Sequence, residues 1–437
     1  MNRKFISYPV DNFIEIKTKM LNWTKQFNIF CLLDNHEYNP PDSYRGHRDA
    51  SGFECLLAAG SIKAISAKTG NAFDSLQNFV SEKRDWIFGH LAYDLKNEIE
   101  DLTSQNFDGI QYPDISFFIP EIVVILKKNC LEIGVIKSEA NNIYQEILSS
   151  TSEHRKINRP NPQIKGRFSK AEYLKAVVRL QQHILRGDCY EINFCQEFYL
   201  ENYEIDPLDI YLRLGNLSPN PFAAFYKLND KYLLCSSPER YLKKVGDKIF
   251  SQPIKGTAKR NLSSITEDER NKKGLLLSKK ETSENVMVVD LVRNDLSKIC
   301  VEGSVKVEEL FGLYTFPQVH QMISTVSGTI NSHASLSDIL KATFPMGSMT
   351  GVPKQKVMEL IEKYEKTKRG LFSGAIGYIT PEGDFDFNVV IRSILYNSTN
   401  KYVSMQAGSA ITFYSDAEKE FEECLVKIEA MKKVMEY

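Results

Sequence analysis

The sequence predicts an α+β fold with antiparallel sheets. Alternating or apolar runs recur along the chain, and turns short enough for hairpins join some of them, as at Glu382-Gly383; this pattern is typical of antiparallel strands. Stretches with helical periodicity lie between these runs. At 437 residues the chain exceeds the usual size of one hydrophobic core, so we expect two modules or one large interwoven domain.

One helix carries its own start and stop signals. Ser169 and Glu172 form the capping-box pattern, in which each side chain accepts a hydrogen bond from the other residue's backbone N–H. Apolar residues follow at helical spacing as far as Gly187, where the helix is expected to end. The same periodicity predicts helices over residues 141–149, 267–290, 355–364 and 416–436.

Strands are expected where apolar residues alternate or run together. The clearest cover residues 117–126, 232–236, 375–379, 387–395 and 402–407. Residues 149–165, in contrast, are polar, contain two prolines and lack periodicity, which is typical of a surface connection. We therefore expect a boundary there, between an N-terminal region of residues 1–150 and a second region of residues 165–437.

Composition excludes several classes of protein. Lys and Arg total 55 against 56 for Asp and Glu, so no overall field favours nucleic acid or an anionic membrane. The longest apolar stretch, residues 122–126, is far short of the ~20 residues of a membrane helix, and residues 1–10 lack a signal-peptide core, so we expect a cytoplasmic protein. The eight cysteines form no close CxxC pair, which argues against disulfides and structural zinc.

Two predicted helices carry paired carboxylates. Glu281 and Glu284 stand three residues apart, as do Glu420 and Glu423, and Lys427 continues the second strip. Two such strips facing one cavity would suit Mg²⁺, which takes one or two protein carboxylates together with water and substrate oxygens. The same spacing also occurs on solvated helix faces, so the pattern alone leaves both interpretations open.

Two segments and one arginine could bind anions. The Gly-rich residues 345–354 lead into a predicted helix, where free N–H groups attract anions, although the spacing is not that of a nucleotide-binding P-loop. Gly408 follows a strand and allows close backbone approach. Both segments could instead be purely structural. Arg392 interrupts an apolar strand, where a guanidinium needs an anionic partner, either a substrate carboxylate or an internal Asp or Glu.

Three further residues are candidates for catalysis. Lys255 lies between an apolar residue and a glycine in QPIKGT; burial there would lower its pKa and make the amine a nucleophile, whereas a turn would leave it exposed. Glu239 could be a general acid or simply a partner of Arg240. His320 could be catalytic or packed.

In order, the segments SPER, PIKGT, SENVMVVDLVRND, FPQVHQMIST, FPMGSMTGVPK, GAIGYI, VVIRS, QAGSAI and EFEECLVKI resemble the chorismate-utilising family. This family includes anthranilate, aminodeoxychorismate, isochorismate and salicylate synthases. The resemblance extends from about Phe168 to the C-terminus. It implies a single large α+β domain in which two antiparallel sheets pack as a sandwich with helices outside. It also implies that residues 1–150 are woven into the same fold and that residues 165–437 form the catalytic, chorismate-binding part.

The resemblance also implies roles for single residues. Glu284 and Glu423 match the Mg²⁺ ligands, with Glu281 and Glu420 nearby. Glu239 matches the general acid that protonates the departing C4 hydroxyl of chorismate. The positions that match the substrate pocket are Thr350, Tyr378, Arg392, Gly408, Ser409 and Lys427. His320 matches a histidine that serves pyruvate elimination in the anthranilate-forming branch.

Lys255 separates the branches of the family. The motif PIKGT resembles the branch that forms aminodeoxychorismate, whereas the anthranilate-forming branch resembles PIAGT. In the former the lysine attacks C2 of chorismate, and ammonia from a glutamine amidotransferase subunit then adds at C4. The alternatives are an anthranilate synthase component and a non-catalytic chorismate-binding subunit. Two positions depart from the family pattern: Glu191 stands where CYQVN has Gln, and Ser409 replaces a small apolar residue.

Overall fold

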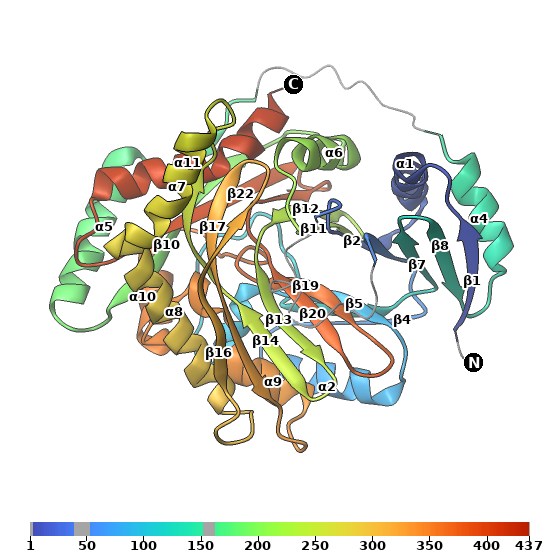
Figure 1. The fold of residues 1–437 in the computed structure, drawn as a ribbon, viewed down its shortest axis with the longest axis horizontal. Helices are drawn as coiled ribbons and strands as arrows, with labels where there is room; N and C mark the ends of the chain where they lie inside the picture. The colour runs from blue at the N-terminus through green and yellow to red at the C-terminus, as the bar shows by residue number, and fades with distance from the viewer. Residues whose placement is uncertain (1–2, 39–52, 152–161, 437) are drawn as a thin grey trace.

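Two large antiparallel sheets form the frame of the computed structural model, which describes residues 3–38, 53–151 and 162–436 (Figure 1). The first sheet has the order β1 (Lys4–Pro9), β8 (Cys130–Val135), β7 (Ile122–Lys127), β3 (Cys55–Ala59), β2 (Ile29–Asp34), β11 (Phe222–Leu228), β12 (Lys231–Ser237), β21 (Ser393–Asn397), β22 (Tyr402–Ile411), β10 (Glu191–Leu200) and β18 (Gly351–Val352), and β9 (Lys165–Gly166) pairs with β10. The predicted α+β fold is confirmed.

The second sheet is built in the same antiparallel way. Its order is β15 (Ile254–Lys259), β17 (Val319–Thr329), β14 (Lys248–Gln252), β13 (Arg240–Val245), β20 (Phe385–Val389), β19 (Ala375–Ile379), β5 (Ile87–Leu91), β6 (Ile115–Ile119) and β4 (Lys63–Ala67), and β16 (Lys306–Thr315) pairs with β17. The N-terminal region contributes strands to both sheets, because β2 pairs with β11 and β5 pairs with β19.

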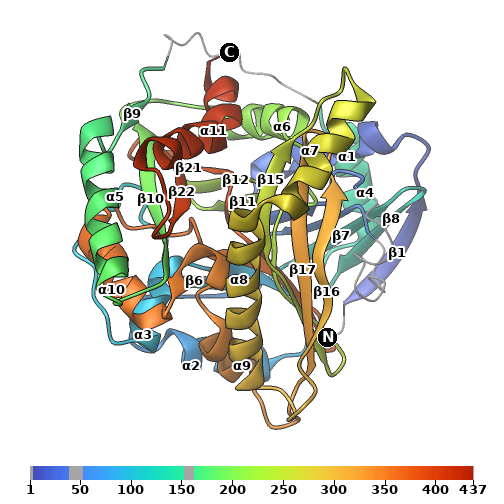
Figure 2. The same ribbon diagram turned by 60° about the vertical axis from the view of Figure 1, so that its left-hand side comes forward.

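Helices cover the outer faces of the two sheets. They are α1 (Phe13–Trp23), α2 (Ala72–Glu82), α3 (Lys96–Ile99), α4 (Ala140–Ser149), α5 (Lys170–Leu185), α6 (Pro207–Leu217), α7 (Ile265–Leu277), α8 (Lys279–Ser297), α9 (Leu336–Thr343), α10 (Lys354–Tyr364) and α11 (Ala417–Met435). Figure 2 shows α8 alongside β15 and β17, and α11 packs on β22. Within the described ranges, no helix has the length and apolar character needed to cross a membrane.

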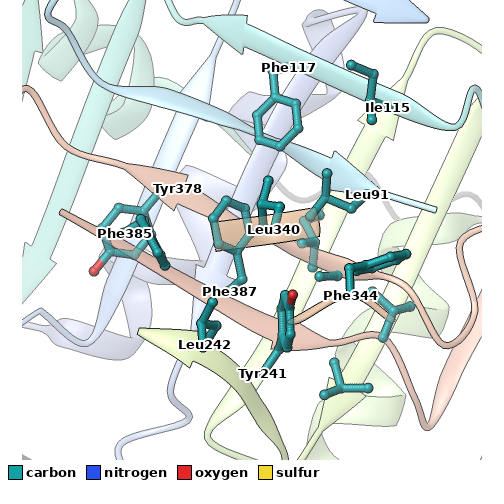
Figure 3. Packing of buried hydrophobic residues seen from close by; sticks show 14 of the residues in the cluster. Leu91, Ile115, Phe117, Tyr241, Leu242, Leu340, Phe344, Tyr378, Phe385 and Phe387 are labelled. Atoms are coloured by element: carbon teal, nitrogen blue, oxygen red, sulfur yellow. The ribbon is translucent and has the colours of Figure 1, made fainter. Parts of the chain in front are cut away.

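Apolar side chains fill both sides of the first sheet. Along β2, Cys31 faces the cluster shared with the second sheet, whereas Phe30 and Leu32 face the cluster beneath α1, α4, α6 and α11. This alternation is what a strand covered on both faces requires. Around the second sheet, Leu340 and Phe344 from the α9 end pack with Phe387 (Figure 3).

Several predicted elements are confirmed. The capping box of Ser169 and Glu172 is present, and α5 ends just before Gly187, whose φ is +86°. Helices α4, α10 and α11 and strand β19 lie where periodicity places them.

Three predicted elements are each two elements in the structure. Residues 117–126 form β6 and β7, which belong to different sheets and are separated at Pro120, a residue without a backbone N–H for a ladder. Residues 387–395 form β20 and β21, again in different sheets, with Arg392 at a φ of +52° between them. Residues 267–290 form α7 and α8, interrupted by Ser278. The last two breaks lie at or near candidate site residues: Arg392 lies between β20 and β21, and Glu281 lies just after Ser278.

Candidate active site

Lys255 lies on a β-bulge at the edge of the second sheet. Ile254 pairs with Ile323 and Thr257 pairs with Gln321, so β15 has one residue more than β17 in this interval. Gly256 has a φ of +94°, and a side chain there would come within 3.2 Å of Glu281 Oε2. Only glycine adopts this conformation without strain. The glycine of PIKGT therefore permits the bulge, and a bulge redirects the side chains it carries.

The Lys255 side chain is buried among carboxylates. It is 8% exposed, and its Nζ donates a hydrogen bond to Glu191 Oε1 at 2.7 Å and lies 3.9 Å from Glu284 Oε2. The exposed alternative is therefore wrong. The expected direction of the pKa is also wrong: burial lowers the pKa of Lys255, but Glu191, Glu284 and Glu239 together raise it above its ordinary value. A nucleophilic Lys255 must therefore lose a proton as substrate binds.

Glu239 has the character of a general acid. It lies between β12 and β13 and is 4% exposed. Burial raises its pKa to about 7, although hydrogen bonds from Ser348 and Ile254 and the charge of Lys255 oppose this rise. A carboxyl group with such a pKa can hold a proton near neutral pH and donate it. Arg240, the alternative partner, forms two hydrogen bonds with Asp386 at 2.9 Å.

The Gly-rich segment, residues 345–354, lies beside Glu239. Residues 347–349 form a single 3₁₀ turn before β18 and α10. A small cavity beside Glu239 is lined by Met346, Gly347 and Ser348 of this segment and by Val292 of α8. The segment therefore lies next to Glu239, the one candidate site residue of the described chain that lines this cavity.

The two acidic strips face each other. Ser278 caps α8 by accepting a hydrogen bond from the backbone N–H of Glu281, so Glu281 and Glu284 lie in the first two turns of that helix. Lys280 Nζ lies 3.1 Å from Glu420 Oε1 and 3.9 Å from Glu284 Oε1. One ammonium group therefore bridges α8 and α11.

The buried carboxylates fit a hard divalent cation. Oε1 of Glu284 and Oε2 of Glu420 are buried and accept no hydrogen bond, which is costly for a carboxylate. Burial, with the charge of Glu191, raises the pKa of Glu284 to about 7 although Lys255 opposes the rise. In the described part of the chain, no three His, Cys, Asp or Glu side chains form a metal-binding cluster by themselves. Mg²⁺ does not need such a cluster, because water and substrate oxygens complete its shell.

Cationic groups line the α11 side of this region. Arg392 is half-buried at the crossing between the sheets, and its Nη1 donates to the Lys427 carbonyl at 3.3 Å. No salt bridge joins its guanidinium to a carboxylate of the described residues, but burial lowers the pKa of Arg392 and the nearby charge of Glu423 opposes this change. Lys427 Nζ donates to the Gly408 carbonyl at 2.7 Å and pairs with Glu423 at 2.6 Å. Arg392 can therefore still bind a ligand carboxylate in a bidentate way.

Comparison with known proteins identifies the family of the chain. Residues 42–433 match the family described as "chorismate binding enzyme". The chain belongs to the chorismate binding enzyme family. The expected recognition and the use of chorismate are thereby confirmed.

The sequence is similar to relatives with two different printed activities. It is 33% identical to "Aminodeoxychorismate synthase component 1" of Salmonella typhimurium, over 78% of this chain and 74% of that protein. It is 34% identical to "Probable aminodeoxychorismate synthase, chloroplastic" of Oryza sativa subsp. japonica, over 80% of this chain but only 43% of that longer protein. It is also 30% identical to "Anthranilate synthase component 1" of Aquifex aeolicus, over 80% and 74% of the two chains.

The fold is likewise shared with a solved member of the family. The crystal structure of anthranilate synthase component I from Streptococcus pneumoniae superposes with a TM-score of 0.77 and 26% identity, covering 86% of this chain and 91% of that one.

Some residues that match the family motifs have contacts away from Lys255, Glu239 and Glu284. Tyr378 belongs to the buried core of the second sheet (Figure 3). Its ring centroid lies 5.7 Å from that of Trp86 and 6.1 Å from that of Phe88. His320 is 1% exposed, and its ring nitrogens lie 3.0 Å from Asp268 Oδ1 and 3.0 Å from Thr315 Oγ1. Both residues therefore have structural contacts that account for their position.

Two other matched residues are also engaged within the protein. Thr350 Oγ1 donates to the Met346 carbonyl at 2.8 Å and so braces the Gly-rich segment. Ser409 Oγ lies 3.2 Å from the Tyr173 hydroxyl, on the side of the strand that faces α5. A backbone contact from Gly408 and Ser409 to substrate stays a prediction.

Sequence reasoning gave Lys280 no role in the site, and it treated Glu191 only as a departure from the family pattern that could change the hydration of the ring or the charge of Lys255. Glu191 is 3% exposed and is the closest partner of Lys255. The sequence signal that pointed to this residue was its departure from the family pattern. Lys280 precedes Glu284 by four residues, a spacing that brings side chains together on a helix. That spacing could have indicated it.

Proposed function

We propose that this chain is the chorismate-aminating component of an aminodeoxychorismate synthase. It would convert chorismate and ammonia to 4-amino-4-deoxychorismate, a precursor of para-aminobenzoate and folate. One observation carries the proposal: Lys255 of PIKGT is buried, with its amine directed at the carboxylates of Glu191 and Glu284. An anthranilate-forming relative resembling PIAGT has no amine at this position. Relatives from Salmonella and rice bear the proposed name.

In the first step the Lys255 amine forms a bond to C2 of chorismate. The ring double bonds shift, the bond from C4 to its hydroxyl oxygen breaks, and Glu239 protonates that oxygen so that water leaves. Covalent catalysis of this kind replaces one difficult substitution by two easier ones. The pKa of Glu239, about 7, suits this proton transfer because the carboxyl group can be protonated at working pH.

In the second step ammonia forms a bond to C4. The double bonds shift back, the bond between C2 and Lys255 breaks, and the lysine leaves as an amine. The sum is chorismate plus ammonia giving aminodeoxychorismate plus water, with no change of oxidation state. Pyruvate stays on the product, which distinguishes this reaction from anthranilate formation.

Substrate carboxylates would be bound from both sides of the site. Arg392, which forms no salt bridge with a carboxylate of the described residues, would bind one of them, and Lys427 would add positive charge beside it. Glu284 and Glu423, with Glu281 and Glu420 close by, would hold Mg²⁺. When bound, Mg²⁺ orients the ring carboxylate and neutralises its charge.

Ammonia would come from a separate glutamine amidotransferase subunit. The bacterial relatives are named "component 1", which supports a second component. Seven of the eight cysteines are buried, and burial raises the pKa of Cys189 to about 11. A glutaminase nucleophile needs an accessible thiolate, so these buried cysteines do not suit that role.

The test is product identification. The purified chain is incubated with chorismate, Mg²⁺ and ammonium at mildly alkaline pH; products are identified by chromatography and mass spectrometry, and pyruvate is assayed in parallel. Aminodeoxychorismate without pyruvate, lost in Lys255→Ala, supports the proposal. Anthranilate with stoichiometric pyruvate would move the chain to the other branch. No turnover, even with an added amidotransferase subunit, would favour a non-catalytic chorismate-binding subunit.

A further inference from the structure

Glu191 is the group closest to the Lys255 amine. Its carboxylate is 3% exposed, and Oε1 accepts a hydrogen bond from Lys255 Nζ at 2.7 Å. Glu284, at 3.9 Å, is the next carboxylate, and it belongs to the acidic strip proposed for Mg²⁺. Two carboxylates therefore compete for one ammonium group, and the shorter contact is the one to Glu191.

The backbone of Glu191 is fixed from both sides. Glu191 pairs with Val352 of β18, and the neighbouring Ile192 pairs with both Gly351 of β18 and Ile411 of β22. Gly351 has a φ of +143°, and a side chain there would lie 2.0 Å from the Glu191 carbonyl oxygen. This glycine therefore allows β18 to close on β10. The side chain of Glu191 therefore starts from a fixed backbone, and its burial at 3% exposure restricts the rotamers that it can adopt.

Lys255, in contrast, needs an external constraint. Its amine is attached through a flexible four-carbon chain with many rotamers, and it starts from a bulge at the sheet edge rather than from a regular strand. A nucleophile accelerates a reaction most when it is held within reach of the reacting atom, and a displacement of about 1 Å can cost on the order of 100-fold in rate. The hydrogen bond to Glu191 gives this amine one defined position among these rotamers.

Building on the proposed function, we propose that Glu191 is a positioning residue for Lys255. Its carboxylate oxygen holds the amine at the point from which it attacks the chorismate ring and keeps it apart from Glu284. The role depends on the place of the acceptor oxygen rather than on its charge. A glutamine, the residue that resembles the family pattern here, would place an amide oxygen at the same distance along the side chain.

Two conservative variants separate position from charge. Glu191→Gln keeps the length of the side chain and an acceptor oxygen but removes the charge, whereas Glu191→Asp keeps the charge and withdraws the carboxylate by one methylene. The matched controls are Glu197→Gln and Glu197→Asp. Glu197 lies on the same strand, is also 3% exposed, and bonds Arg167 and Ser404 rather than Lys255.

The experiment is a rapid-quench time course with full-length protein. Each variant is mixed with saturating chorismate and Mg²⁺ without ammonia, and the Lys255 adduct is quantified by peptide mass spectrometry; kcat and KM are then measured with ammonium. We expect Glu191→Asp to form the adduct at least about 10-fold more slowly, with KM for chorismate within about 3-fold. Glu191→Gln should form the adduct faster than Glu191→Asp, and both Glu197 variants should stay within about 3-fold of the unmodified chain.

Slower adduct formation in Glu191→Gln than in Glu191→Asp would overturn the positioning role, because it would show that the charge of Glu191 determines the rate. Equal adduct rates in the Asp and Gln variants would overturn it as well. Failure of the proposed function has a different signature: the unmodified chain would itself form neither the adduct nor aminodeoxychorismate. Thermal melting of every variant identifies any loss of fold.

Discussion

Lys280 Nζ lies 3.1 Å from Glu420 Oε1 and 3.9 Å from Glu284 Oε1, so a lysine occupies the space between the two acidic strips. The ammonium group partly offsets the repulsion between carboxylates of α8 and α11. Buried Oε1 of Glu284 and Oε2 of Glu420 nevertheless accept no hydrogen bond. The region therefore has unused negative charge, which a divalent cation can balance.

Mg²⁺ should consequently stabilise the folded chain. A ligand at 100 times its Kd adds about 2.7 kcal/mol to the free energy of unfolding, so Mg²⁺ should raise Tm in differential scanning calorimetry. Glu284→Gln should reduce this rise strongly. Glu422→Gln is the control, because Glu422 is exposed on α11 next to the same strip; it should leave the rise unchanged. An equal Mg²⁺ effect in both variants would exclude Glu284 as a ligand.

Arg392→Lys should weaken chorismate binding. The guanidinium can form two parallel hydrogen bonds with a carboxylate, whereas an ammonium is a point charge. A hydrogen bond to a charged group contributes about 1.5–3 kcal/mol, so KM for chorismate should rise roughly 10- to 100-fold while kcat falls less. Steady-state kinetics measures this split. A fall in kcat alone would mean that Arg392 does not bind the ground-state substrate.

The sequence predicted where helices and strands lie better than it predicted which sheet each strand joins. The capping box of α5 lies in four neighbouring residues, so local signals were enough to identify it. The sequence predicts one strand over residues 387–395 because six of these nine residues are apolar; only the sheets themselves show that β20 and β21 separate at Arg392. Periodicity indicates buried faces, but it does not say which sheet a strand joins.

The same limit applies to the site. Motif order indicated Lys255, and its burial is borne out, but the direction of its pKa depends on three carboxylates that come from distant segments. For Tyr378 the strand β19 was correctly located, yet only the packing against Trp86 and Phe88 reveals its surroundings. Charges and neighbours that meet through tertiary structure have no local sequence signal.

Glu239 should give stability and activity a pH dependence. Its folded-state pKa of about 7 lies above the ordinary 4.5, so the folded state binds the proton more tightly than the unfolded state does. This stabilisation is present below pH 4.5 and is lost as the pH rises toward 7. The rise corresponds to roughly 3 kcal/mol, so Glu239→Gln should gain stability relative to the unmodified chain between pH 5 and 8.

Urea unfolding at several pH values measures that gain. In parallel, kcat with ammonium should collapse in Glu239→Gln, because the amide cannot donate a proton to the departing hydroxyl. A variant that kept its activity would show that Glu239 is not the acid. Parallel stability curves for the two proteins would show that its pKa is not raised.

Gly408→Ala should destabilise the sheet through overpacking. Gly408 pairs with Cys195 of β10, and a methyl group at Gly408 would lie 2.4 Å from Cys195 Sγ and 2.7 Å from the Phe194 carbonyl oxygen. The backbone contact cannot move aside easily, so the free energy of unfolding should fall by about 1–3 kcal/mol. The matched control is Gly274→Ala on α7, where nothing lies within 4 Å and alanine should stabilise the helix by roughly 0.5–1 kcal/mol. Chemical denaturation of the two variants should therefore give opposite shifts, and a stabilising Gly408→Ala would show that β10 and β22 are not held this closely.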